Sequence, residues 1–285
     1  MSHFYNFHIS PYSCSFGYML ENVVKSFTWS AAWEVDHAKK TVELLATTLD
    51  ERNQIMAGTL KAEHEKGTFK VLSDWRDEMF AIYGPDSELV LSMERTGAPL
   101  FGITTYGIQL LAWEQHAEGP KLWIAKRATT KRRFPTMLDS TVGGCLPTSE
   151  SPFECLVRES GEEASIPAEV VRKHAKACGT LNYIYVTDAR SGGELGLISP
   201  EVQFLYEMEK PAGLEFEPRD GEVEKFVLCG VEEVKERLKN GDFTPANGCV
   251  VLDFLIRHGI IKYESERDYI QIVSRLHRSL PFPTR

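Results

Sequence analysis

The sequence has no excess of positive charge. Its 32 lysine and arginine residues are outnumbered by 41 aspartate and glutamate residues, which gives a formal net charge of −9 at pH 7. Proteins that bind nucleic acid or an anionic membrane surface usually present a strongly basic surface. We therefore expect neither nucleic acid nor a membrane among the partners of this protein.

Closely spaced cysteines are also missing. The sequence contains no CxxC pair and no series of short cysteine spacings, so it does not resemble a disulfide framework or a zinc site. We interpret the scattered cysteines as free thiols of a reducing compartment and expect a cytoplasmic protein. The six residues are Cys14, Cys145, Cys155, Cys178, Cys229 and Cys249.

No hydrophobic run approaches the length of a membrane span. Runs such as Cys249–Leu252 and Phe254–Ile256 are far shorter than the about 20 apolar residues that a spanning helix needs. The first residues show neither a basic region followed by an apolar stretch nor an Arg-rich amphipathic pattern, so we expect no targeting peptide. What is present is an ordinary globular composition, with 42% hydrophobic and 11% aromatic residues. A chain of 285 residues suits two domains.

Turn residues and apolar patterns divide the chain at Gly97-Ala98-Pro99. We expect a smaller α+β N-terminal domain at residues 1–100 and an α/β or α+β sandwich with a mixed sheet and C-terminal helices at 101–285. In the first domain the predicted strands lie on either side of a turn at 36–40 and at 88–95, with a helix at 49–65. In the second, the predicted strands are 103–115, 121–128, 180–188, 202–209 and 224–230, with a short strand entering a glycine turn at 138–146. The predicted helices are near 152–164, 168–177, 231–239, 246–257 and 266–278.

The segment 144–166, GCLPTSESPFECLVRESGEEASI, predicts a well-defined helix start. Ser151 can cap the helix, Pro152 suits its first position and Glu154 completes a capping box. Apolar residues then recur at steps of three and four, which predicts one buried face.

Three carboxylates share another face of this helix. Glu159, Glu162 and Glu163 are neighbours on a helical surface, and like charges at this spacing repel one another. A divalent cation with oxygen ligands would relieve the repulsion, and Mg²⁺ takes carboxylates together with phosphate oxygens. The alternative is an acidic face that is simply solvated.

The spacing of Gly144, Glu150, Arg158-Glu159 and Glu162-Glu163 resembles the signature of the Nudix hydrolases. Two positions depart from that signature. Ser160 stands where an aliphatic residue is expected, and we expect its hydroxyl to bond to a carbonyl one turn earlier. Ser165 stands where a glycine usually ends the helix, while Ile166 fits the final aliphatic position.

The resemblance extends over most of the chain. Segments such as SFGYMLENVV, SDWRDEMFAIYGP and VLDFLIRHGII look like one Nudix subfamily, which has an extra N-terminal domain and is related to thiamine pyrophosphokinase. The resemblance implies a Nudix α/β/α sandwich and a Mg²⁺-dependent hydrolase, with Mn²⁺ as the alternative metal.

The resemblance also implies roles for individual residues. Glu159, Glu162 and Glu163 would be metal ligands, completed by the carbonyl of Gly144 or Gly143 and by an acid near a strand start, Glu222 or Glu224. Glu159 is our first choice of general base, and Arg158 and Glu150 would orient the ligands.

A cluster of basic residues precedes Gly143 and Gly144, in a chain that is acidic overall. We interpret it as a clamp for a phosphate, the alternative being a charged hairpin loop; it contains Lys126, Arg127, Lys131, Arg132 and Arg133. Tyr183, Tyr185 and Gln203 lie on predicted strands. They are candidates to bind a substrate ring, or are ordinary sheet residues.

These interpretations predict hydrolysis of a small diphosphate compound. The subfamily resemblance favours thiamine diphosphate or its oxidised derivatives, cleaved to the monophosphate and phosphate. The alternatives are a hydrolase of ADP-sugars or dinucleotides, and a binding protein that has kept the fold without catalysis. The sequence leaves a monomer and a homodimer equally open.

Overall fold

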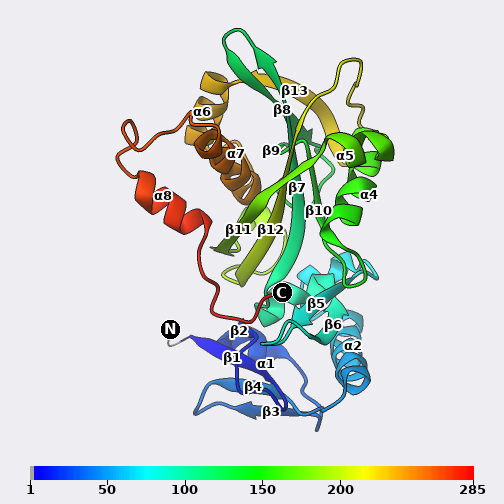
Figure 1. Ribbon diagram of the computed structural model, residues 1–285. Helices are drawn as coiled ribbons and strands as arrows, with labels where there is room; N and C mark the ends of the chain where they lie inside the picture. Colours follow the sequence, from blue (N-terminus) through cyan, green and yellow to red (C-terminus); the bar gives the residue numbers. More distant parts are fainter. Residues whose placement is uncertain (1–2) are drawn as a thin grey trace.

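The N-terminal domain joins a small sheet to one long helix. The computed structural model describes residues 3–285, and Figure 1 shows this domain in blue and cyan below the larger one. A sheet of four strands has the order β2-β1-β4-β3, with β1 and β4 parallel. A separate hairpin pairs β5 with β6. The elements are β1 (Phe4–Ile9), β2 (Gly17–Leu20), α1 (Glu21–Ser26), β3 (Trp33–Asp36), β4 (Thr41–Leu44), α2 (Leu49–Lys66), η1 (Val71–Asp74), β5 (Met79–Tyr83), β6 (Leu89–Glu94), η2 (Arg95–Gly97) and α3 (Ala98–Phe101).

The second domain is built on a mixed sheet. Its main path runs β11-β12-β7-β8-β13, with β10 added to β7 and β9 added to β8. Of its pairings only β12 with β7 is parallel. The strands are β7 (Thr105–His116), β8 (Gly119–Arg127), β9 (Leu138–Asp139), β10 (Val142–Cys145), β11 (Lys176–Val186), β12 (Ile198–Glu209) and β13 (Val223–Gly230).

Helices cover both faces of this sheet, as Figure 1 shows. On one face Leu156 of α4 packs with Ile108 and Leu110 of β7. On the other, Phe254 of α7 packs with Leu111 and Leu122. The helices are α4 (Pro152–Ala164), α5 (Ala168–His174), α6 (Val231–Asn240), α7 (Pro245–Arg257) and α8 (Tyr269–Leu276), with the short turn η3 (Ala189–Ser191) before β12. The predicted α/β/α sandwich with a mixed sheet is therefore confirmed.

Close backbone contacts hold β2 against the last segment of the N-terminal domain. A Cβ at Gly17 would lie 2.3 Å from the carbonyl oxygen of Phe101, and one at Gly102 would lie 2.1 Å from that of Tyr18. Gly102 also has a φ of 62°, which ends α3 in the left-handed conformation. Because only glycine allows so close an approach, β2 is held directly against the segment that leads into β7.

Several predicted elements need correction. The predicted glycine turn is wrong, because Gly143 and Gly144 lie within β10 and pair with β7. The last helix is shorter than predicted, and α1, β1, β2 and β5 were not predicted at all. Within residues 3–285, no helix is both long and apolar enough to cross a membrane.

Candidate functional site

Helix α4 is fixed at both ends by local interactions. The hydroxyl of Ser151 accepts the N–H of Glu154 at 3.4 Å, but the predicted capping box is incomplete because the Glu154 carboxylate pairs with Arg172 instead. At the other end Ser165 adopts a φ of 55°, and its hydroxyl donates to the carbonyl of Glu217 at 3.0 Å. Serine thus takes the left-handed position that glycine usually occupies.

Ser160 does not make the hydrogen bond that we expected. The side chain of this α4 residue is fully buried, and its Oγ has no hydrogen-bond partner among residues 3–285. A buried hydroxyl without a partner costs about 1–3 kcal/mol. The aliphatic residue of the Nudix signature would fit this position better.

Arg158 gathers the acidic residues of the signature. Its guanidinium donates to Glu150 at 2.9 Å and to Glu162 at 2.8 Å, and lies 3.0 Å from an oxygen of Glu159. Arg158 is therefore paired with Glu150 as well as with the two acids of the helix. One cation thus holds two carboxylates of α4 together with that of Glu150 in the loop before the helix.

Glu159 packs against the backbone of β10. A Cβ at position 144 would lie 2.4 Å from its carboxylate carbon, so glycine is needed there. Burial raises the pKa of Glu159 to about 7, although the Arg158 charge opposes the shift. A carboxyl group with a pKa near 7 can both accept and release a proton at neutral pH.

A second group of carboxylates meets Glu163. Oxygens of Glu163, Asp220 and Glu222 all lie within 4.8 Å of one another, close enough to share a cation. The N–H of Gly143 donates to Glu163 at 2.9 Å. Burial and the Glu159 charge nevertheless raise the pKa of Glu163 well above its usual range. Asp220 was missed by the sequence analysis, although it stands two residues before Glu222 in the turn RDGEVEK.

Three of the predicted carboxylate ligands lie outside this group. Glu159 packs on Gly144 and lies beside Arg158. Glu162 is 52% exposed and pairs with Arg158. Glu224 pairs with Lys126 at 2.8 Å. Of the two strand-start acids that the sequence offered, the structure therefore brings only Glu222 to Glu163.

Most of the basic cluster is engaged by acids of other segments. Arg127 donates to Asp139 at 2.5 Å and to the carbonyl of Phe134 at 3.1 Å, so it holds the loop between β8 and β9. The remaining pairs are Lys126 with Glu224, Lys131 with Glu222 and Arg132 with Asp74.

Arg133 differs from the rest of the cluster. Its guanidinium donates to the hydroxyl of Tyr185 at 2.6 Å, and among residues 3–285 it forms no salt bridge with a carboxylate. Its charge therefore remains available to an anion.

Tyr183 and Gln203 both support a third residue, Glu201. One oxygen of Glu201 accepts the Tyr183 hydroxyl at 2.6 Å and the Gln203 amide at 3.1 Å. The amide of Gln109 in turn donates to Gln203 at 3.3 Å. The other Glu201 oxygen has no hydrogen-bond partner within the described range 3–285, so it can meet a ligand.

Cys145 lies on the same part of the sheet as Gln203. It lies opposite Gly107 in the sheet, and Gly107 lies opposite Gln203. Burial raises the pKa of the Cys145 thiol, while the charges of Arg95 and Arg133 lower it and those of Glu78 and Glu201 raise it. Charged groups from both domains therefore influence the residue that follows Gly144.

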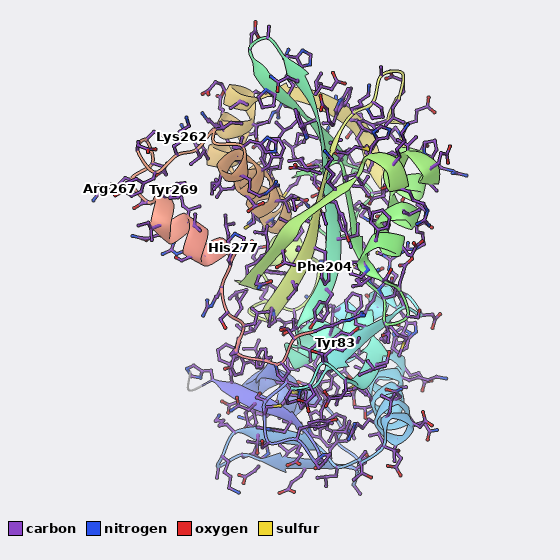
Figure 2. The ribbon with its side chains drawn as sticks, in the orientation of Figure 1. Tyr83, Phe204, Lys262, Arg267, Tyr269 and His277 are labelled. Atoms are coloured by element: carbon purple, nitrogen blue, oxygen red, sulfur yellow. The ribbon has the colours of Figure 1, made fainter. Side chains whose placement is uncertain are left out.

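A cleft opens beside α4 at the domain junction. It has a volume of about 510 Å³, and its lining residues are Glu78, Pro147, Ser149, Glu150, Arg158 and Glu159. Figure 2 shows Tyr83 of the same hairpin as Glu78 at this junction, below Phe204. Tyr83 and Phe204 both lie beside Tyr106, with ring centroids 5.5 and 6.5 Å away. Glu78 comes from the N-terminal domain and was not identified from the sequence.

Comparison with protein families divides the chain in two. Residues 2–105 match a family described as a domain of unknown function, DUF4743. Residues 110–247 match the NUDIX domain family.

Three curated proteins show how far the similarity extends. Uncharacterized protein YJR142W of Saccharomyces cerevisiae is 32% identical over 267 residues, covering 92% of this chain and 78% of the yeast protein. Nudix hydrolase 20, chloroplastic, of Arabidopsis thaliana is 32% identical, covering 83% of this chain and 60% of the plant protein. Nudix hydrolase 24, chloroplastic, of the same plant is 31% identical, covering 83% and 62%. The chain thus spans less than two thirds of either plant relative.

Among solved structures, DR0079 from Deinococcus radiodurans aligns with a TM-score of 0.43 and 16% identity, covering 70% of this chain and 100% of that one.

Proposed function

Because residues 110–247 match the NUDIX domain family and two relatives are named Nudix hydrolases, we propose that the chain is a Nudix hydrolase that cleaves thiamine diphosphate, or an oxidised derivative of it, to the monophosphate and phosphate. The observation that carries the diphosphatase part of the proposal is the convergence of Glu163 and Glu222 beside α4. A divalent cation shared by these carboxylates would offset their repulsion, and phosphate oxygens commonly complete the coordination of Mg²⁺.

The acidic residues fit a divalent metal. Glu163, Glu222 and Asp220 offer only hard oxygen ligands, the donor type that Mg²⁺ and Mn²⁺ prefer. Glu159 and the carbonyl of Gly144 would complete the site. Glu162 remains a further candidate ligand, although its carboxylate here pairs with Arg158.

The reaction would be displacement at phosphorus by water. A bound divalent ion would withdraw charge from the phosphoryl oxygens and acidify a water molecule. The Glu159 carboxylate would take one proton from the attacking water as the new O–P bond forms. The bridging P–O bond then breaks, and the leaving phosphate keeps its electron pair. Arg158 would hold Glu159 in position during the transfer.

Arg133 is the best-placed phosphate ligand of the predicted clamp. It presents several N–H donors, and its described partner is the neutral hydroxyl of Tyr185. Lys126 and Arg127 stay predicted substrate ligands, yet both already hold carboxylates. Binding through either of them would require those pairs to break.

Glu201 supports a thiamine compound as the substrate. The thiazolium ring of thiamine is a cation, and its aminopyrimidine ring carries N–H donors. Glu201, held by Tyr183 and Gln203, offers a partly buried carboxylate to both kinds of group. A neutral adenine ring would gain less from the same charge.

A substrate panel tests the proposal. Phosphate release would be measured with Mg²⁺ for thiamine diphosphate, its oxidised derivatives, ADP-ribose, ADP-glucose and diadenosine polyphosphates. We expect the thiamine compounds to have the highest kcat/KM, and we expect Glu163→Gln to lose at least 100-fold in kcat with any of them. Preferred cleavage of an ADP compound would favour the nucleotide alternative. If no compound is hydrolysed but one binds, the protein is a non-catalytic relative.

We also propose that the protein works in the cytoplasm, as a monomer or homodimer. All six cysteines are free thiols, which suits a reducing compartment. The two plant relatives are named as chloroplastic. Microscopy of a fluorescent fusion in the source cells would decide between the two locations.

A further inference from the structure

We propose that the N-terminal domain forms one wall of the substrate cleft and that its Arg95 binds a phosphate oxygen of the diphosphate. The inference rests on the proposed function, because it assumes a diphosphate in the cleft. Its starting point is that Glu78, which pairs with Arg95, lines the same cleft as Glu159 and Arg158.

The hairpin β5–β6 fixes the position of Arg95. The N–H of Arg95 donates to the carbonyl of Glu78 at 2.8 Å, and the two side chains form an ion pair. The guanidinium also lies over the ring of Phe80, 5.8 Å from its centroid. The charge is therefore held at a defined place on the wall.

The same hairpin is attached to the loop that enters α4. The N–H of Thr148 donates to the carbonyl of Met79 at 2.8 Å, and the Thr148 hydroxyl lies 2.7 Å from that of Ser92 on β6. Thr148 stands between Pro147 and Ser149, both of which line the cleft. The N-terminal wall and the catalytic helix thus share one rigid connection.

Arg95 keeps donors free for a ligand. Within residues 3–285 the only hydrogen bond of its guanidinium goes to Glu78, and 31% of the side chain is exposed. Arg158, by contrast, is occupied by three carboxylates. The charges of Arg95 and Arg133 both lower the pKa of the Cys145 thiol, so a diphosphate bound near this residue would be attracted by both.

Without substrate, the Glu78 carboxylate would pair with the Arg95 guanidinium in place of a phosphate oxygen. It holds Arg95 in the absence of substrate, and a phosphate carrying more charge would take over the guanidinium. Removing Glu78 and removing Arg95 should therefore have different consequences for phosphate binding. A pair that only braces the hairpin would instead make the two removals equivalent.

The test compares Arg95→Gln, Arg95→Lys and Glu78→Gln in the full chain. Arg172→Gln is the matched control, because Arg172 forms an arginine–glutamate pair with Glu154 at the outer side of α4. Two quantities would be measured: KM for the best diphosphate of the panel, and the Kd of magnesium pyrophosphate by calorimetry. The Kd of magnesium pyrophosphate is measured without any turnover of substrate. Melting temperatures would report on folding.

We expect Arg95→Gln to raise both KM and the Kd of pyrophosphate about tenfold, the loss of one charge-assisted hydrogen bond, with kcat within about threefold of wild type. Arg95→Lys should retain most of the affinity, and Glu78→Gln should leave it unchanged or tighter. Arg172→Gln should match wild type. Should Arg95→Gln not fold, the comparison of Arg95→Lys with Glu78→Gln decides whether Arg95 binds phosphate.

Equal loss of affinity and stability in Glu78→Gln and Arg95→Gln would overturn the inference, as would an unchanged Kd in Arg95→Gln. Either result leaves the proposed function intact as long as Glu163→Gln is inactive. Failure of the proposed function is seen separately, in the absence of hydrolysis by the wild-type protein.

Discussion

Replacing Gly144 with alanine tests whether Glu159 must pack directly on the backbone of β10. Gly144 is not among the glycines with positive φ, so alanine is compatible with its backbone conformation. The added Cβ would lie 2.4 Å from both Cγ and Cδ of Glu159 and 2.5 Å from its Oε1. The substitution therefore acts on one functional side chain.

The size of the effect follows from these distances. Ordinary contact with a Cβ begins at 3.4 Å, so the carboxylate carbon has to move by about 1 Å, the difference between 3.4 and 2.4 Å. A misplacement of about 1 Å in a reacting group costs about 100-fold in rate, which is about 2.7 kcal/mol of activation free energy. We expect Gly144→Ala to lose that much in kcat, and to lose about 1–3 kcal/mol of stability through overpacking.

Gly161→Ala is the matched control on the same helix. Its added Cβ would contact only the carbonyl oxygen of Ile166, at 3.8 Å, and alanine favours a helix over glycine by about 1 kcal/mol. Steady-state hydrolysis of the best substrate and thermal melts would be recorded for both variants. A Gly144→Ala protein as active as Gly161→Ala would refute the claim that Glu159 needs its present position.

Three further predictions concern metal binding, pH and the core. Glu222→Gln should weaken Mn²⁺ binding, measured by calorimetry, about tenfold, while Glu224→Gln should not change it; equal effects would contradict the carboxylate group as described. Burial raises the folded-state pKa of Glu159 to about 7 from 4.5, so its contribution to stability is complete below pH 4.5 and is lost as the pH rises through 7. Thermal melts without metal should therefore show a loss of stability between pH 5 and 8 that is smaller in Glu159→Gln, and an identical loss in that variant would argue against the shift. Ser160→Ala removes a buried hydroxyl without a partner and should stabilise the protein by about 1 kcal/mol in denaturant unfolding; a destabilised variant would mean that the hydroxyl is satisfied.

The functional helix could be predicted closely because its signals are local. Ser151 and Pro152 define where α4 begins, and the left-handed Ser165 defines where it ends. The spacing of Glu159 and Glu163 along one helix likewise needs no knowledge of the rest of the fold. These residues were therefore found from the sequence alone.

The remainder of the site depends on tertiary structure. Asp220 is an ordinary acid in an exposed turn until the sheet brings the start of β13 beside Glu163. Glu78 belongs to a hairpin in another domain, and no spacing along the chain connects it with α4. For the same reason the sequence could not show that Lys126 and Arg127 are paired. Their acidic partners, Glu224 and Asp139, come from other segments.

The hydrogen bonds of Thr148 with Met79 and Ser92 join the two domains beside the cleft, at the place where a hinge would otherwise be. We therefore expect substrate to enter by movement of side chains and loops, because swinging the two domains apart would break this joint. In solution the protein would diffuse and scatter as one particle, with or without substrate. A calorimeter would record its two domains as a single melting unit.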